Sequence, residues 1–262
     1  MNNEIKVLDH GYVKLIEVYG SDERIVEAAR MSTNKGFLGW GPIHEISCGM
    51  HPNFLHSKYP KQLGIEYPPK CNCNSKPGDE KLLKYLYEHK HMTPFEMAGM
   101  IIEIQAPIFV FREWHRHRTQ SYNELSARYT PLPNLNYVPD IDRIMINAGA
   151  SNKQAGTIKD AVDLNESAAI SFRMRVDEIY RQLEDFYQIY LNRGVPKELA
   201  RIILPVGRYS RMRASANLRN WLAFLTLRMD KNAQWEIRQY ANVVGQLINE
   251  NFPKTWELFN TK

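Results

Sequence analysis

Residues 112–128, REWHRHRTQSYNELSAR, form a short segment in which arginine and histidine are interleaved with acidic and hydroxyl side chains. A helix face exposed to water more often carries lysine and glutamate four residues apart. Arginine differs from lysine because its planar guanidinium binds phosphates and carboxylates through two parallel hydrogen bonds. The segment therefore predicts a binding site for an anionic, hydrogen-bonding small molecule. The alternative is a basic surface segment whose arginines are held in ion pairs.

The composition is typical of a soluble globular protein. The chain has 262 residues, of which 44% are hydrophobic, and its formal net charge is +5. Its three cysteines, Cys48, Cys71 and Cys73, favour a reducing cytoplasm without disulfides. The N-terminal residues lack the pattern of a secretory signal, and no apolar run is long enough to span a bilayer. We therefore expect a cytoplasmic protein with no membrane partner.

Apolar periodicity predicts the secondary structure. A period of two residues indicates strands and a period of 3.6 residues indicates helices, with Ser, Gly and Pro marking many of the ends. We expect strands within residues 4–19, 97–106 and 206–216, and helices over residues 21–32, 78–89, 108–118, 165–193, 196–204, 217–228 and 233–252.

No repeat or linker divides the chain, so we expect one α+β domain over residues 1–262. Its predicted architecture is a central, mostly antiparallel sheet flanked by two groups of helices. The irregular residues 34–78 and the small, polar residues 146–160 are expected to be insertions or loops. Residues 131–145 are rich in proline and are expected to be extended.

Several kinds of site are not favoured by the residue spacing. His115 and His117, like Cys71 and Cys73, are separated by one residue, whereas zinc ligand pairs are usually separated by two to four. Glycine-rich phosphate loops of the Walker and Rossmann types are absent. Ser126 lacks the flanking glycines of a strained nucleophile turn. We therefore expect no metal, and we expect any nucleotide to be held chiefly by side chains.

A second group of basic side chains lies toward the C-terminus. Its members are Arg201, Arg208, Arg211, Arg213, Arg219 and Arg228. The last two occur in a helix that is otherwise apolar, and arginines beside such a face often border a pocket or an interface. Together with nearby aromatic residues, the same arginines would suit a basic nucleic-acid-binding protein, which is the alternative function. Acidic residues mixed into both basic segments weigh against binding a nucleic-acid polymer.

Several motifs resemble one enzyme family. The run Arg116-His117-Arg118, followed after seven residues by Ser126, resembles the R-H-R-x7-S signature of flavin-dependent thymidylate synthases. HMTPFEM, at residues 91–97, resembles the family's H-x-T-P-F-E-H segment. Further segments that resemble the family are ARIILP and NLRNWLAFLTLRMDKNAQWEIRQYA, at residues 200–205 and 217–241. The similarity covers most of residues 5–33, 79–132 and 168–260, with the motifs in the same order as in the family.

The resemblance implies which residues bind the cofactor and the substrate. FAD would be bound by Ser32, His91, Thr93, Glu96, Arg116, His117, Arg118, Glu124, Asn217 and Arg219. The substrate dUMP would be contacted by Glu113, Arg116, Glu124, Ser126, Arg128, Arg201 and Arg228. Arg128 and Arg201 suit its phosphate. The implied catalytic residues are Arg228, which would polarise a uracil carbonyl, and Ser126, which would orient the nucleotide.

The resemblance also implies the reaction, which is the reductive methylation of dUMP to dTMP. Methylene tetrahydrofolate would supply the carbon and leave as tetrahydrofolate, and FAD reduced by NADPH would supply the hydride. A further implication is a homotetramer whose active sites combine residues from several subunits.

Four positions depart from the family pattern. Met97 replaces a histidine, and Glu113 stands where some members carry glutamine. Ala223 and Asn232 fall where some members place asparagine and histidine near the flavin. These departures bear on the details of ligand binding rather than on the reaction.

Overall fold

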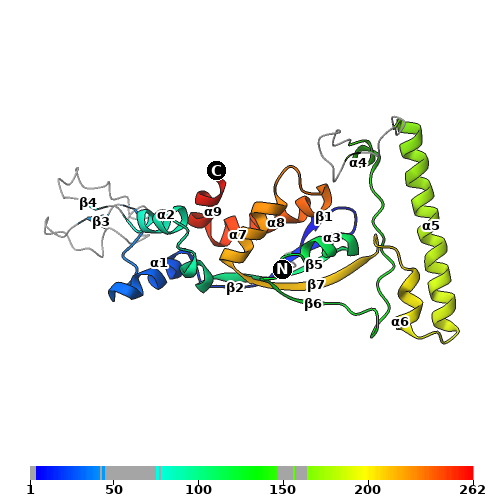
Figure 1. Cartoon of the computed structure of the whole chain (residues 1–262), viewed down its shortest axis with the longest axis horizontal. Coiled ribbons are helices and arrows are strands. Elements are labelled where there is room, and N and C mark those ends of the chain that lie inside the picture. Colours follow the sequence, from blue (N-terminus) through cyan, green and yellow to red (C-terminus); the bar gives the residue numbers. More distant parts are fainter. Residues whose placement is uncertain are drawn as a thin grey trace, which may run out of the picture.

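The protein is built on a five-stranded antiparallel sheet with the strand order β1-β2-β5-β7-β6 (Figure 1). The computed structural model describes residues 4–41, 43–44, 75–76, 78–146, 156 and 164–261. The strands of the sheet are β1 (Glu4–Val7), β2 (Gly11–Tyr19), β5 (Gly99–Pro107), β6 (Ser121–Glu124) and β7 (Tyr209–Asn217). A separate antiparallel pair consists of β3 (Ile43–His44) and β4 (Ser75–Lys76).

The central strand β5 shows why the sheet has one buried and one polar face. Met100, Ile102 and Ile104 are fully buried, whereas Glu103 and Gln105 point to the opposite face. Successive side chains of a strand point to opposite faces, so alternating apolar residues give one face to pack against helices. The expected strand at residues 97–106 is thus confirmed.

Helices cover the apolar face and one end of the sheet. The helices are α1 (Asp22–Arg30), α2 (Glu80–Glu88), α3 (Ile108–Trp114), α4 (Ile141–Met145), α5 (Glu166–Asn192), α6 (Lys197–Ala200), α7 (Leu218–Arg228), α8 (Trp235–Asn251) and α9 (Pro253–Asn260). Three 3-10 helices are η1 (Met31–Thr33), η4 (Thr93–Met97) and η5 (Arg201–Ile203). One group, α3, α7 and α8, packs on the sheet, and a second group, α1, α2 and α9, gathers at one end (Figure 1).

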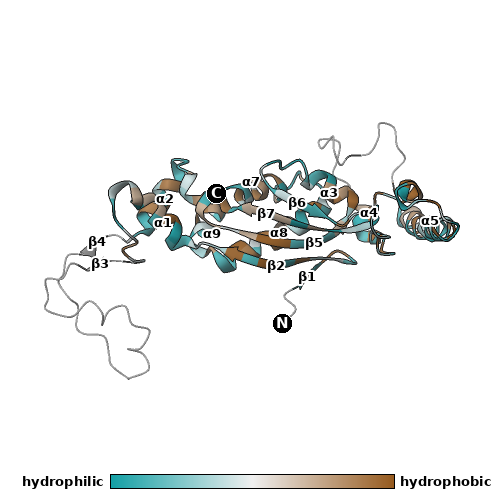
Figure 2. Ribbon diagram, turned by 90° about the horizontal axis from the view of Figure 1, so that it is seen from below, coloured by the Kyte–Doolittle hydropathy of each residue, from teal (hydrophilic) through white to brown (hydrophobic). Residues whose placement is uncertain are grey.

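The opposite face of the sheet is not covered by the described helices (Figure 2). Its side chains are polar, as expected for a face in contact with water, and include Glu103, Arg211 and Arg213. The predicted α+β class, with an antiparallel sheet and two groups of helices, is confirmed.

An aromatic cluster joins α3 and α7 over the sheet. Trp114, Trp221 and Phe224 are fully buried, and the Trp114 and Phe224 rings stack with their centroids 4.5 Å apart. A buried aromatic side chain removes about 150–250 Å² from water, so this cluster contributes strongly to the core. It fixes α7, which carries Arg219 and Arg228, and the end of α3, where the arginine-rich loop begins.

Three predictions of local structure are wrong. The helix expected over residues 108–118 ends at Trp114, because the Tyr122 hydroxyl contacts the carbonyl oxygens of Trp114 at 3.1 Å and His117 at 2.7 Å. Residues 121–124, expected to be loop, form the edge strand β6. Helix α4 interrupts a segment expected to be extended, and α9 had no counterpart among the expected elements. Most of residues 34–78 and 146–160, and all three cysteines, lie outside the described residues, so the predicted insertions stay a prediction.

The buried carboxylate of Asp79 generates a test of the fold. It accepts hydrogen bonds from the Arg30 guanidinium and from the backbone N–H groups of Leu38 and Gly39, at 2.7 and 3.3 Å for the latter two. We expect Asp79→Ala to lower the free energy of unfolding by about 3–5 kcal/mol, because the largely buried Arg30 guanidinium and two N–H groups lose their fully buried partner. Glu178→Ala, which breaks the exposed pair with Arg175, should cost about 0–1 kcal/mol. Urea denaturation measures both, and equal losses would contradict the role of Asp79.

Candidate functional site

The loop between α3 and β6, residues 115–120, carries the arginine-histidine-arginine motif and is tied to the core. The buried indole Nε1 of Trp114 donates a hydrogen bond to Gln120 Oε1 at 3.1 Å. From α7, the Asn220 side-chain amide donates to the carbonyl oxygen of Thr119 at 3.0 Å. Both bonds start from helices on the sheet, so the loop has a defined position relative to α7.

Three predicted residues form one cluster at the end of α7, which we call the Arg228 cluster: Glu113, His117 and Arg228. The Arg228 guanidinium donates to Glu113 Oε2 at 2.6 Å, to the Glu113 carbonyl oxygen at 2.8 Å and to His117 Nε2 at 2.9 Å. Only 17% of the Arg228 side chain is exposed. These bonds orient its guanidinium rigidly and join α7 to α3 and to the loop that follows it.

Burial sets the protonation states in the Arg228 cluster. Burial, together with the neighbouring Arg228 charge, lowers the pKa of His117 to about 4. The imidazole is therefore neutral near pH 7 and accepts the Arg228 hydrogen bond. Burial also raises the pKa of Glu113, and the Arg228 charge opposes that shift.

A second set of predicted residues lines a cavity of about 330 Å³, which we call the Ser126 pocket. The predicted members are Glu124, Ser126 and Arg201, which come from the end of β6, the turn after it and η5. The remaining lining residues are Ile108, Leu125, Ala127, Leu132, Leu204 and Ser210. The walls of the cavity therefore combine apolar side chains with polar and charged ones, and its volume is in the range of small-molecule sites. Reasoning from the sequence did not identify Ser210, which is distant from the motif in the chain.

The predicted arginines divide into paired and unpaired groups. Arg128 lies 3.5 Å from a carboxylate oxygen of Glu198. By contrast, Arg116, Arg118 and Arg201 form no ion pair with any carboxylate in the part of the chain that the structure describes. All three are exposed. The basic segment is therefore not simply a surface held in ion pairs, and three guanidinium groups are available for an anionic ligand.

A third set of predicted residues lies around η4 and the start of α7. Glu96 of η4 forms an ion pair with Arg219, and Asn217 caps α7 by accepting a hydrogen bond from the Asn220 N–H at 3.0 Å. Leu218 N donates to the Ala98 carbonyl oxygen at 2.7 Å, which holds η4 against this helix start. The structure thus brings Glu96, Asn217 and Arg219 together from segments that are distant in sequence.

Three other residues predicted to bind FAD lie before η4, in η4 and in η1. His91 and Thr93 are exposed, and the His91 ring meets that of Tyr85 edge-on at 5.7 Å. Ser32 is exposed in η1, where its hydroxyl donates to the Ala29 carbonyl oxygen. Of the family departures, Met97, Ala223 and Asn232 are also exposed.

Within a single subunit, the residues predicted to contact dUMP do not all lie in one site. The Ser126 pocket is lined by none of Glu113, Arg116 and Arg228. Among the described residues, no hydrogen bond or ion pair links the Arg228 cluster to Ser126 or Arg201. Five of the seven predicted substrate residues therefore form two groups in the single subunit, and Arg116 and Arg128 belong to neither group.

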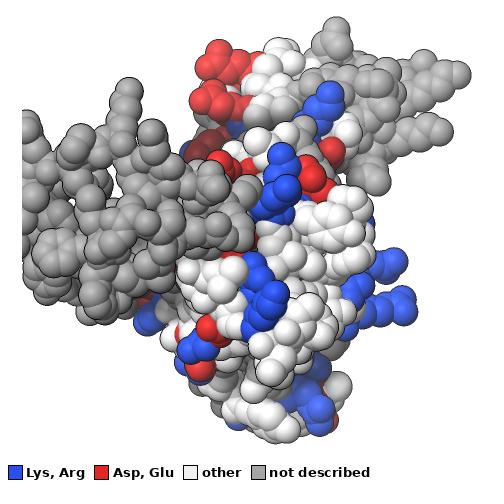
Figure 3. All heavy atoms as spheres, turned by 90° about the vertical axis from the view of Figure 1, so that its left-hand side faces the viewer, with Lys and Arg blue, Asp and Glu red and all other residues white. Residues whose placement is uncertain are grey.

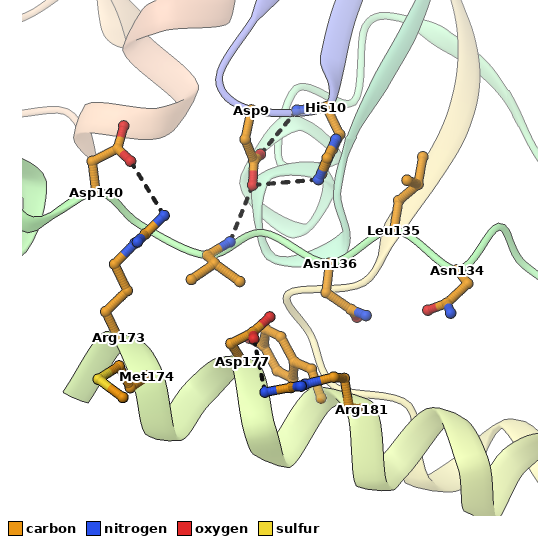
Figure 4. Close-up of a pocket in the computed structure, with 12 residues that line it drawn as sticks. Asp9, His10, Asn134, Leu135, Asn136, Asp140, Arg173, Met174, Asp177 and Arg181 are labelled. Carbon is orange, nitrogen blue, oxygen red and sulfur yellow. Dashed lines mark hydrogen bonds and ion pairs between the residues drawn. The ribbon is translucent and has the colours of Figure 1, made fainter. Parts of the chain in front are cut away.

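A larger cavity, of about 590 Å³, lies between α5, the turn after β1 and the segment at residues 134–140 (Figure 4). Its charged side chains pair with one another, as Asp177 does with Arg181 at 3.1 Å and Asp140 with Arg173 at 3.8 Å. None of the predicted site residues lines it. We therefore take the Ser126 pocket, not this cavity, as the candidate substrate site.

Two features are absent from the part of the chain that the structure describes. No group of three or more His, Cys, Asp or Glu side chains there is arranged to hold a metal ion. None of the helices within the described ranges has the length and apolar character needed to cross a bilayer.

Comparisons with known proteins agree on one family. The sequence profile of the family described as "Thymidylate synthase complementing protein" matches residues 14–254. A flavin-dependent thymidylate synthase from Thermosipho melanesiensis is 36% identical over 259 residues, which cover 98% of this chain and 93% of that protein. The enzyme of the same name from Thermosipho africanus is 35% identical over 259 residues, which again cover 98% of this chain and 93% of that protein. A solved structure of the UMP/dUMP methylase PolB from Streptomyces cacaoi, bound with 5-Br UMP, is similar with a TM-score of 0.70 and 26% identity, and the match covers 98% of this chain and 96% of that one.

The lowered pKa of His117 predicts a pH dependence of stability. Between its ordinary pKa of 6.5 and its folded pKa of about 4, the unfolded chain binds a proton that the folded protein does not. Its contribution to the free energy of unfolding therefore falls as the pH decreases through this window. We expect acidification from about pH 7.5 to about pH 5 to lower the melting temperature less in His117→Gln than in the wild type. His89→Gln, at an exposed histidine, should behave as the wild type, and equal pH slopes in all three proteins would contradict the assignment.

Proposed function

Because the chain belongs to the flavin-dependent thymidylate synthase family, we propose that it catalyses the reductive methylation of dUMP to dTMP. In this proposal methylene tetrahydrofolate donates the carbon and leaves as tetrahydrofolate, and FAD reduced by NADPH is the source of the hydride. The PolB structure, whose protein is a UMP/dUMP methylase, supports the methylation of a uridine nucleotide.

The Ser126 pocket is the observation that carries the proposal. It combines the hydroxyl of Ser126 and the carboxylate of Glu124 with Arg201, whose guanidinium has no ion-pair partner among the described residues. An unpaired guanidinium in a small pocket suits a nucleotide phosphate, which it binds through two hydrogen bonds. In our proposal Arg201 and Arg128 bind the phosphate of dUMP. Ser126 orients the nucleotide, and Glu124 binds it beside the flavin.

Arg228 is the proposed electrophilic residue. Three of the five N–H groups of its guanidinium are used in the Arg228 cluster, so two remain to donate to a uracil carbonyl oxygen. A fixed positive charge at that oxygen stabilises the negative charge that develops on the ring during reaction. Neutral His117 accepts one of the three bonds without adding charge, and Glu113 completes the orientation.

The residues proposed to hold FAD fit a large anionic cofactor. Arg116 and Arg118 offer exposed guanidinium groups without an ion-pair partner in the described part of the chain, which suits a pyrophosphate. Polar groups around η4 and α7, namely Glu96, Asn217 and Arg219, suit hydrogen bonds to a ribose or a ring edge. The remaining proposed contacts are Ser32, His91, Thr93, His117 and Glu124.

We also propose a homotetramer with active sites shared between subunits. Helix α5 lies at the end of the sheet remote from α1 (Figure 1), and within its 27 residues only Ala169, Glu184 and Tyr187 are buried. Phe172, Ile179 and Phe186 follow one another at intervals of seven residues and are 52%, 44% and 48% exposed. That spacing makes a stripe on one side of a helix, as in helix–helix interfaces. Assembly would also bring together the two groups of dUMP residues that one chain keeps apart.

The face of the molecule drawn in Figure 3 does not favour the alternative, a nucleic-acid-binding protein. On the face that Figure 3 shows, Lys and Arg side chains lie in separate groups, several of them beside Asp or Glu, with uncharged surface between them. Binding to a nucleic-acid backbone usually requires a continuous basic surface.

The proposed function is tested on the purified protein. We expect it to carry or bind FAD, to show a flavin spectrum that bleaches with NADPH, and to form dTMP from dUMP and methylene tetrahydrofolate. Protein that binds no FAD and makes no dTMP under these conditions would refute the proposal.

Arg228→Ala tests the electrophilic role. We expect dTMP formation to fall by about 100-fold or more, the loss typical of removing a charge-stabilising donor, while FAD content stays close to that of the wild type. Arg24→Ala, which removes an exposed arginine paired with Glu27 on α1, is the matched control and should keep its activity. Loss of FAD together with activity would show that Arg228 holds the fold or the cofactor instead.

Phe172→Glu tests the α5 interface. A buried charge at a subunit contact is unfavourable, so the variant should assemble less completely than the wild type. Light scattering after size-exclusion chromatography measures the mass. Ser171→Glu adds the same charge at an exposed neighbouring position off the stripe and serves as the control. A Phe172→Glu variant with the mass of the wild type would exclude this stripe as an interface.

A further inference from the structure

Ser210, near the start of β7, has a buried hydroxyl that finds no hydrogen-bond partner in the described part of the chain. Its side chain is 1% exposed, and its Oγ forms no hydrogen bond with any described residue. Native proteins rarely leave a buried polar group unsatisfied, so such a group points to a ligand or to a bound water. Ser210 also lies in the wall of the Ser126 pocket.

The strand register explains why Ser210 lies in that wall. Glu124 of β6 pairs with Met212 of β7, and the N–H of Leu125 donates to the Arg211 carbonyl oxygen at 2.8 Å, which continues the ladder by one residue. Ser126 follows Leu125 at the start of the turn after β6, where its carbonyl oxygen accepts from the N–H of Tyr129 at 3.0 Å. Two hydroxyl side chains, one from β7 and one from this turn, therefore line the same pocket.

We propose that Ser210 donates a hydrogen bond to the phosphate of the nucleotide bound in the Ser126 pocket. The inference rests on the proposed function and adds a substrate-binding residue to it. A phosphate offers strong acceptor oxygens, and the guanidinium of Arg201 in the same pocket supplies the opposite charge. Rotation about the Cα–Cβ bond moves a serine hydroxyl between three staggered positions, so Oγ can turn toward a ligand without movement of the strand.

A ligand role and a purely structural role predict opposite effects of Ser210→Ala. If the hydroxyl serves only the ligand, its removal takes away an unsatisfied group, so the ligand-free protein keeps or gains thermal stability. Affinity for dUMP falls at the same time. If the hydroxyl instead binds a structural water, Ser210→Ala lowers thermal stability and leaves the affinity for dUMP unchanged.

The experiment compares the FAD-loaded wild type with Ser210→Ala, Ser210→Thr and Ser215→Ala. Steady-state dTMP formation gives KM for dUMP and kcat, calorimetry gives Kd for dUMP and for inorganic phosphate, and thermal unfolding is followed without nucleotide. For Ser210→Ala we expect KM and Kd for dUMP to rise about tenfold or more, the loss typical of a hydrogen bond to a charged group, with kcat within about threefold of the wild type. Its affinity for inorganic phosphate should fall in parallel.

The other variants make the test specific. Ser210→Thr keeps a hydroxyl and should stay within about threefold of the wild type in KM. Ser215→Ala removes a hydroxyl from the same strand but on its other face, and should match the wild type. An unchanged KM in Ser210→Ala, or a loss confined to stability, would overturn the inference. A wild type that neither binds dUMP nor forms dTMP would instead overturn the proposed function.

Discussion

The three hydrogen bonds of the Arg228 guanidinium hold the Arg228 cluster and the start of the arginine-rich loop in their observed form. They connect the last residue of α7 to the Glu113 side chain and carbonyl on α3 and to the imidazole of His117 in the following loop. Helices α3 and α7 both pack on the sheet through the aromatic cluster. The three bonds therefore anchor the arginine-rich loop to helices that are fixed in the core. An arginine that is oriented before the substrate binds loses less conformational entropy on binding, which is the condition for efficient charge stabilisation.

The antiparallel sheet supplies the second requirement, which is proximity between distant segments. Strand β7 lies between β5 and β6, so it places the residues that precede β7, including Arg201 in η5, beside the turn after β6. The Ser126 pocket is a product of this long-range pairing. A shift of the β6–β7 register by one residue would turn Glu124, the last residue of β6, to the opposite face and remove it from the pocket.

Much of this arrangement could be predicted from the sequence, but the parts that depend on long-range contacts could not. The alternation in β5 and the helical period in α8 are strong local signals, and Ile237, Tyr240 and Val244 of α8 are all buried as expected. Strand β6 was missed because its four residues, SYNE, show no apolar alternation, and it is stabilised by a partner strand about 90 residues away in sequence. The early end of α3 depends on the Tyr122 hydroxyl, a side-chain contact that helix propensity does not describe.

The contacts of the arginines also depend on residues that are distant in sequence. Motif and composition alone therefore did not decide whether the basic segment binds a ligand or is a surface held in ion pairs. In the sequence, Arg118, Arg201 and Arg219 are equivalent basic residues. In the structure, Glu96 neutralises Arg219 from 123 residues away, whereas Arg118 and Arg201 find no carboxylate in the described part of the chain. An exposed unpaired guanidinium has little effect on stability, because water solvates it. Unpaired guanidinium groups are therefore not needed for the fold, and Arg201, which lines the Ser126 pocket, is the one we propose for the phosphate of the nucleotide.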